Sequence, residues 1–244
     1  MQIKHLNTLR PAEVLFFLNG KKLPVGKLIF TTMMDMVFRN ILMINEGHEQ
    51  SHATETPRKV FTVGTGSHFS SYHPAKYEQP IYRLWNGNTK KEFYIKTMVK
   101  GVYNMYPDEG HWHKAVREEM AHYISDSWTA IFFSFPLNEE GELVKEQLLS
   151  ELEWINTKMR ITLPDEQQAE IIASIGANVF MTRLSVNLPA FHRAYTMKDY
   201  WKDVRNENLA GFFLEPIAGA GFDTVGDVFS GLFDNISFDF DWGG

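Results

Sequence analysis

Apolar positions recur every three or four residues near the start of the chain, which is the spacing of a helix with one buried face. A first helix is predicted to begin at Pro11, because the missing N–H of proline costs nothing at the first helical position. It is predicted to end at Asn19-Gly20, a pair suited to a left-handed C-terminal turn. The cap position holds Arg10, whose side chain has no acceptor for the free amides of the first turn.

A second helix is predicted over residues 25–39, where apolar side chains again repeat at helical spacing. Met33, Met36 and Val37 lie on this apolar stripe and are expected to be buried. A short connector that contains a proline separates this helix from the first one.

Two short strands are predicted to follow the second helix. The apolar run over 41–44 suits a strand, and residues 59–63 return beside it after a polar loop over 45–57. Two helices followed by such a hairpin have the layout of a winged helix. We therefore predict a winged-helix unit over residues 1–75.

Three motifs in this region together resemble a known family. They are residues 9–13 (Leu-Arg-Pro-Ala-Glu), the Asn19-Gly20 turn, and the run over 34–42 (Met-Asp-Met-Val-Phe-Arg-Asn-Ile-Leu). This pattern resembles the start of the cytoplasmic portion of a family of bacterial predicted membrane proteins of unknown function. The resemblance implies a winged-helix fold, often followed by a second similar unit, and it transfers no active site. The sequence departs from the family at Arg10, where a small polar cap is usual.

The rest of the chain is predicted to be mainly helical, with short strands, so the expected fold class is α+β. A second helical unit is predicted over 76–160, with a degenerate winged helix as one interpretation of it. A third helical segment with an aromatic and acidic tail is predicted over 161–244. Helices are expected near residues 81–85, 93–103, 111–124, 142–155 and from 163 onward, with an apolar strand over 128–135.

The helix over 142–155 is expected to be amphipathic, with a carboxylate-rich outer side. Glu151 and Glu153 are two positions apart and so face different directions, which makes an acid–base pair a poor interpretation and a solvated face the better one. The residues expected to face inward are Leu143, Leu148, Leu149, Leu152 and Ile155.

The segment 236–242 alternates strictly between apolar and polar residues, as a half-buried strand does. Residues 222–244 contain five Asp and neither Lys nor Arg, so the tail is acidic. Alternation places Phe238, Phe240 and Trp242 on one face. We interpret the segment as an edge strand of its own chain, or alternatively as a detachable arm, and these aromatic residues as the partner-binding or self-association surface.

Composition narrows the classes of function. The chain of 244 residues is 44% hydrophobic and 14% aromatic, which is typical of a globular protein, and no apolar run has the length of a membrane span or signal segment. We therefore expect a soluble cytoplasmic protein. The absence of cysteine excludes disulfides, thiol catalysis and thiolate metal sites, and a net charge of -6 argues against broad nucleic-acid binding.

A metal site is conceivable on the helix predicted over 111–124. His111, Glu118 and His122 lie on one face by their spacing, and Glu119 and His122 also have a helical ligand spacing. A carboxylate-bridged site would need further ligands from other helices. The better interpretation is an exposed face on which Glu118 and His122 pair, so no metal or other cofactor is expected.

Three functions remain. An interaction or assembly module fits the acidic surface, the aromatic tail and the lack of a catalytic motif. A winged-helix DNA regulator is the alternative, with Thr32, Arg39, Arg58 and Lys59 as possible contacts, but the second helix offers Asp35 on the same polar stripe and few residue types that read bases. An enzyme fits least, because the sequence contains neither a serine elbow nor a zincin motif.

Overall fold

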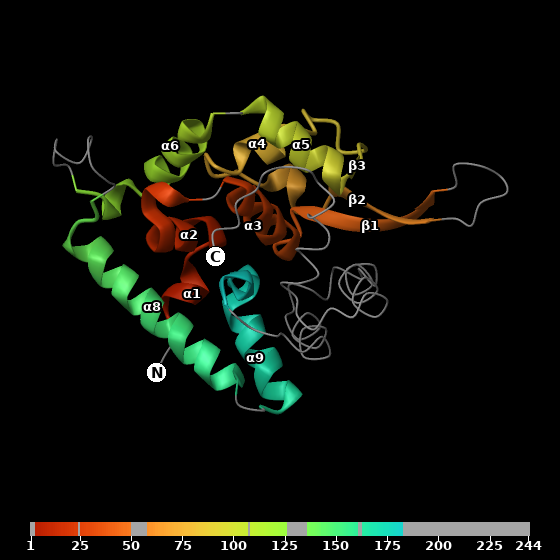
Figure 1. Ribbon diagram of the computed structural model, residues 1–244. Helices are drawn as coiled ribbons and strands as arrows, with labels where there is room; N and C mark the ends of the chain where they lie inside the picture. The colour runs from red at the N-terminus through yellow and green to blue at the C-terminus, as the bar shows by residue number, and fades with distance from the viewer. Residues whose placement is uncertain are drawn as a thin grey trace.

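The structure is a computed structural model that describes residues 3–23, 25–49, 58–106, 108–125, 136–160 and 163–182. Helices make up 65% of these residues and the strands form one small antiparallel sheet, which confirms a mainly helical α+β fold. The helices α1, α2 and α3 lie in the centre, between α4, α5 and α6 on one side and α8 and α9 on the other (Figure 1).

The elements follow one another along the chain with short connections. In the N-terminal half they are α1 (His5–Thr8), α2 (Pro11–Asn19), η1 (Gly20–Lys22), α3 (Val25–Phe38), β1 (Leu42–Glu49), β2 (Arg58–Thr65), η2 (Phe69–Ser71) and α4 (Gln79–Tyr82). They continue with β3 (Phe93–Tyr94), α5 (Ile95–Met105), α6 (Glu109–Glu119), η3 (Ala121–Tyr123), α8 (Glu139–Arg160), α9 (Asp165–Ile175) and η4 (Gly176–Met181).

The first predicted helix is confirmed as α2. The carboxylate of Glu13 accepts the backbone N–H of Arg10 at 2.9 Å, which is one half of a capping box. The helix ends at Gly20, whose φ of +54° favours glycine. The side chain of Arg10 takes no part in capping, because it has no acceptor.

The second predicted helix is confirmed as α3, and Met33, Met36 and Val37 are buried as expected. The polar stripe that carries the possible DNA contact Thr32 would have to be exposed to reach DNA, and this is wrong for Thr32 and Asp35, which are 1% and 8% exposed. The reason is that α2, η4, β1 and α5 pack around α3. A helix covered in this way lacks the free face with which a winged helix reads DNA, so the winged-helix assignment is not confirmed.

The predicted hairpin is present but longer than expected. β1 pairs with β2 from Leu42 opposite Thr65 to Glu49 opposite Arg58, and β3 adds to the other edge of β2. The hairpin extends away from the helices (Figure 1). At its base, Gly66 donates its N–H to the carbonyl of Ile41 at 2.8 Å, and any Cβ there would lie 2.2 Å from the carbonyl oxygen of Asn40.

Two predictions about the later helices are wrong in detail. The helix expected over 111–124 ends at Glu119, and His122 lies in the separate turn η3. In α8, Leu143 and Leu149 are 52% and 49% exposed instead of buried. α8 packs on α1 and α2 with one narrow stripe, and Val144 takes the inward position expected of Leu143.

Glu151 of α8 is also placed differently from the prediction. It was expected on a solvated face, but it is 2% exposed and lies at the N-terminus of α1. Its carboxylate accepts the backbone N–H groups of Lys4 at 3.0 Å, His5 at 3.0 Å and Leu6 at 2.9 Å. Glu151 therefore supplies, from a distant helix, the cap that α1 lacks in its own sequence.

Replacing Glu151 with Ala is expected to lower the free energy of unfolding by about 2 kcal/mol, because buried N–H groups would lose their acceptor. Urea denaturation of the full chain measures the change. Glu153→Ala is the matched control, because Glu153 is exposed on the same helix. Equal midpoints for the two variants would show that Glu151 is not a structural cap.

One core joins the described residues. Buried apolar side chains from Leu6 to Val179 form a continuous cluster, and α1 and α2 contact α8, α9 and η4 across both predicted unit boundaries. The division into units 1–75, 76–160 and 161–244 stays a prediction. The apolar run 128–135 and the tail 236–242 lie outside the described residues. In the ranges that the structure describes, no helix combines the length and apolarity needed to cross a membrane.

Candidate functional site

A buried carboxylate, Glu78, organises the charged residues beside the N-terminal helices. It is 0% exposed and forms ion pairs with Arg10, at 3.1 Å, and with Arg39. Its second oxygen accepts the hydroxyl of Tyr72 at 2.5 Å and the backbone N–H of Ala75 at 2.7 Å. These partners lie directly after α3 and η2 and in the segments before α2 and α4, so Glu78 connects parts of the chain that are distant in the sequence.

Arg39 links this carboxylate to a second one. Its guanidinium donates to the hydroxyl of Tyr72 at 2.6 Å and pairs with Asp35 at 2.7 Å. Burial and the neighbouring Glu78 carboxylate raise the pKa of Tyr72 to about 12, so this hydroxyl stays protonated and able to donate to Glu78. Arg39 is therefore held by three partners.

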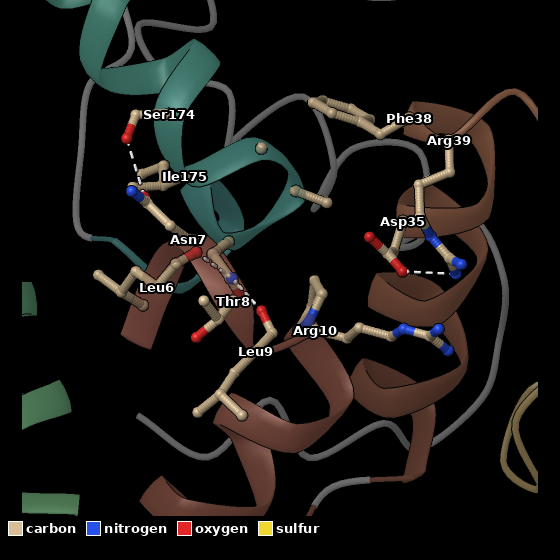
Figure 2. Close-up of a pocket in the computed structure, with 14 residues that line it drawn as sticks. Leu6, Asn7, Thr8, Leu9, Arg10, Asp35, Phe38, Arg39, Ser174 and Ile175 are labelled. Carbon is tan, nitrogen blue, oxygen red and sulfur yellow. Dashed lines mark hydrogen bonds and ion pairs between the residues drawn. The ribbon is translucent and has the colours of Figure 1, made fainter. Parts of the chain in front are cut away.

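Arg10 and Asp35 keep unused hydrogen-bonding capacity. Arg10 carries five N–H donors, and its only described side-chain partner is Glu78; its side chain is 35% exposed. Asp35 binds Arg39 through one oxygen, while Figure 2 shows the other oxygen directed away from Arg39. The site thus offers one set of donors and one acceptor that the described network does not use.

Arg10 and Asp35 are among the residues that line a pocket of about 460 Å³ between α1, the start of α2, α3 and the α9–η4 turn (Figure 2). The volume is in the range of small-ligand sites and exceeds that of one large side chain. Its apolar wall comes from several elements, so the pocket exists only in the folded chain. The apolar lining residues are Leu6, Leu9, Pro11, Phe38, Ile175 and Ala177.

Polar contacts hold the walls of the pocket in place. Ser174 donates its hydroxyl to the side-chain oxygen of Asn7 at 2.8 Å, which joins α9 to α1 (Figure 2). The amide nitrogen of Asn178 donates to the carbonyls of Leu6 at 2.8 Å and Leu9 at 2.7 Å. The amide oxygen of Asn178 is buried and has no hydrogen-bond partner. The pocket is therefore largely pre-formed.

The charge of Asp35 depends on pH near neutrality. Burial raises the pKa of Asp35 to about 6, although the Arg39 guanidinium acts in the opposite direction. An unfolded Asp has a pKa of about 4, so the folded state binds the proton more tightly. Asp35 therefore stabilises the fold below about pH 4, and this contribution is lost as the pH rises through about 6.

The arrangement suits recognition of a ligand. An apolar wall can hold a ring or an aliphatic group, while the N–H groups of Arg10 can bind a carboxylate or carbonyl. The free oxygen of Asp35 can accept an N–H or O–H. The network contains two cations, Arg10 and Arg39, and two carboxylates, Asp35 and Glu78. Its net charge is therefore zero when both acids are ionised.

The metal candidates do not come together in the structure. His111 stacks on Tyr106 with ring centroids 4.3 Å apart. Glu118 pairs with Lys76 at 2.7 Å, and the carboxylate of Glu119 accepts the backbone N–H of Lys76 at 2.8 Å. His122 lies on η3 and not on the helix α6 that carries the other three residues. Within the described ranges, no group of three or more His, Asp and Glu is placed to hold a metal ion.

The possible DNA contacts are divided between two places. Thr32 is buried in α3, and Arg39 is engaged in the network described above. Arg58 and Lys59 open strand β2, opposite Glu49 and His48 on the projecting hairpin. Thr32 therefore cannot reach a DNA groove, whereas the hairpin position leaves Arg58 and Lys59 as the part of that prediction still to be tested. The predicted partner surface, Phe238, Phe240 and Trp242, lies outside the described residues.

Sequence reasoning missed the residues that build the pocket. Two signals were present: Arg10 stands at a helix cap where it cannot cap, and Asp35 stands in an apolar helix where a carboxylate needs a partner. Glu78 and Asn178 gave no local signal, because their partners are distant in the sequence.

Comparison with known proteins found no match: no protein-family model, no curated protein sequence and no solved structure is detectably similar to the chain. The resemblance of the N-terminal motifs to the membrane-protein family therefore stays a prediction.

Proposed function

We propose that the chain is a non-catalytic intracellular interaction or assembly module, and that the pocket between α1, α3 and α9–η4 is its binding site for a short polypeptide segment. The observation that carries the proposal is the combination, among the lining residues of one pocket, of apolar side chains with N–H groups of Arg10 and an oxygen of Asp35 that contacts within the described residues leave unused.

The pocket selects the chemistry of the segment. The apolar wall favours an aromatic side chain, which gains about 2–3 kcal/mol from full burial. The oxygen of Asp35 favours a ring that carries an N–H or O–H donor, since such a donor needs a partner when buried. Arg10 favours a carboxylate next to that ring. We therefore expect the partner to present a tryptophan or tyrosine in an acidic segment.

A labelled, end-capped Asp-Trp-Asp peptide is expected to bind the full chain, and Arg10→Gln is expected to weaken binding about tenfold, because a charge-assisted contact contributes about 1.5–3 kcal/mol. Fluorescence anisotropy measures the affinity. An Asn-Trp-Asn peptide, which lacks the carboxylates, should bind the unmodified chain about tenfold more weakly than Asp-Trp-Asp does. Its affinity for the Arg10→Gln variant should be no lower still.

Arg83→Gln is the matched control, because Arg83 is an exposed arginine whose partners are Gln79 and Tyr106, away from the pocket. Its affinity for the peptide should equal that of the unmodified chain. Equal affinity of Arg10→Gln and Arg83→Gln for the peptide would contradict the proposal. Equal affinity of the unmodified chain for the Asp-Trp-Asp and Asn-Trp-Asn peptides would contradict it as well.

DNA binding is the second candidate function, and the observation in its favour is the projecting β1–β2 hairpin with Arg58 and Lys59 at the start of β2 (Figure 1). A hairpin of this kind can contact phosphates without the help of α3. Duplex DNA in the same anisotropy assay separates the two functions: a hairpin that binds phosphates would give an affinity that falls steeply with added salt.

A further inference from the structure

We propose that the pocket binds an acidic segment together with one proton, which Asp35 takes up from solution. This inference rests on the proposed function, because it concerns the same pocket and the same kind of ligand. Two observations carry it: the balance of charges in the buried network, and the small number of partners that Asp35 has there.

The charges of the buried network are balanced before any ligand binds. Two cations, Arg10 and Arg39, pair with two carboxylates, Asp35 and Glu78. The side chains of these acids are 12% and 0% exposed, so solvent and salt screen them little. A ligand carboxylate at Arg10 would bring a third negative charge to two positive ones. Uptake of one proton by one of the acids restores the balance.

Asp35 is the acid that can take up this proton. Glu78 accepts four donors, and a proton on its carboxylate would have to replace one of them. These donors are Arg10, Arg39, the hydroxyl of Tyr72 and the backbone N–H of Ala75. Among the described residues Asp35 pairs with Arg39 alone, and its second oxygen can carry a hydrogen (Figure 2).

Protonation of Asp35 is compatible with the rest of the site. Arg39 keeps Glu78 and the hydroxyl of Tyr72 as partners when its ion pair with Asp35 is lost. A protonated carboxyl group still has acceptor capacity, so Asp35 can continue to accept an N–H from the ring of the ligand. The proton therefore removes the excess negative charge without removing the recognition of the ring.

The surroundings of Asp35 contain few other charged groups. Three charged side chains of the described residues act on it from the end of α3 and the segments before α4 and α2. They are Arg39, Glu78 and Arg10. Burial raises the pKa of Tyr72 to about 12 and that of Tyr77 well above its usual value, so both hydroxyls are neutral. The turn η4, which packs on α3, consists of uncharged residues.

The direction of the pH dependence follows from the free protein. Burial raises the pKa of Asp35 to about 6, so the free protein carries this proton already at lower pH. There the affinity for an acidic ligand should be nearly independent of pH. Above about pH 6 the proton must be taken up on binding, and the affinity should fall by up to about tenfold for each pH unit.

The test measures the affinity of the full chain for the end-capped Asp-Trp-Asp peptide at about pH 5.5, 6.5 and 7.5, where the peptide carboxylates stay ionised. We expect a loss of about tenfold between the last two values. The uncharged Asn-Trp-Asn peptide should show no such loss. Asp35→Asn, which is neutral at every pH and keeps an acceptor oxygen, should bind Asp-Trp-Asp with nearly the same affinity throughout.

A second measurement needs no variant. Titration calorimetry of the unmodified chain at about pH 7, in two buffers with different ionisation enthalpies, counts the protons exchanged on binding. We expect an uptake of about one proton for each Asp-Trp-Asp peptide bound, because Asp35 is ionised in the free protein at this pH.

The possible outcomes separate the two proposals. Failure of both peptides to bind at every pH would overturn the proposed function itself. A preference for Asp-Trp-Asp that is the same at every pH, without proton uptake, would overturn the role of Asp35 and leave the pocket as a peptide site. A fall in affinity that persists in Asp35→Asn would assign the proton to another group, such as His68, whose ring lies 3.1 Å from the carbonyl of Arg39, and would also overturn the proposal.

Discussion

Replacing Glu78 with Ala is expected to lower the free energy of unfolding by about 3–5 kcal/mol, because Arg10 and Arg39 would lose the buried carboxylate that balances them. Tyr72 and the backbone N–H of Ala75 would lose their acceptor at the same time. Urea denaturation of the full chain measures the change. This is a large effect for one side chain, since an ordinary domain is stable by about 5–15 kcal/mol.

Glu118→Ala is the matched control for this prediction. Glu118 also pairs with a cation, Lys76 at 2.7 Å, but on an exposed surface where water screens the pair. Its removal is expected to leave the midpoint unchanged. If Glu78→Ala unfolded at the same urea concentration as Glu118→Ala, the network around Glu78 would not hold these elements together.

Replacing Met36 with Asp is expected to cost more than about 4 kcal/mol, which is enough to unfold a marginal protein. Met36 is 0% exposed in α3, and a carboxylate there would be buried without a partner. Asp35, the residue beside it, is tolerated because it reaches Arg39. Circular dichroism and the thermal midpoint of the full chain measure the loss.

Met36→Leu is the control for the methionine position, because it keeps the apolar volume and is expected to cost less than about 1.5 kcal/mol. An unchanged thermal midpoint for Met36→Asp would contradict the central place of α3 in the core. It would also remove the reason why Thr32 is inaccessible.

The N-terminal helices could be predicted from the sequence because local signals agree there. The start and the end of α2 follow from Pro11 and Gly20, without any knowledge of the rest of the chain. The inward face of α3 follows from the spacing of Met33 and Met36. These local signals do not tell how many other elements pack around each helix. Periodicity predicted one buried face for α3, whereas packing from several sides buried Thr32 as well.

α8 shows a second limit of periodicity. Leucines occupy both sides of its apolar face, so two inward stripes are compatible with the sequence. The contacts with α1 and α2 select the stripe that contains Val144 and Leu148 and leave Leu143 and Leu149 exposed. Contacts with other helices therefore determine which of the two stripes of α8 is buried, because the sequence of α8 is compatible with both.

The candidate site was less predictable than the fold, because it is built from long-range pairs. Glu78 meets Arg10 and Arg39 only after the chain has folded, and nothing in its own neighbourhood marks it as buried. The informative residues were those in the wrong local setting. An arginine at a helix cap and an aspartate in an apolar helix each need a partner elsewhere.

Photo-cross-linking tests the pocket as a peptide site most directly. The end-capped Asp-Trp-Asp peptide is prepared with benzoylphenylalanine in place of tryptophan, and it is irradiated with the full chain. Mass spectrometry then identifies the residues that are modified. The account predicts modification within residues 6–11 and 174–178, prevented by an excess of the unlabelled Asp-Trp-Asp peptide. Modification confined to other parts of the chain, or insensitive to the competitor, would contradict it.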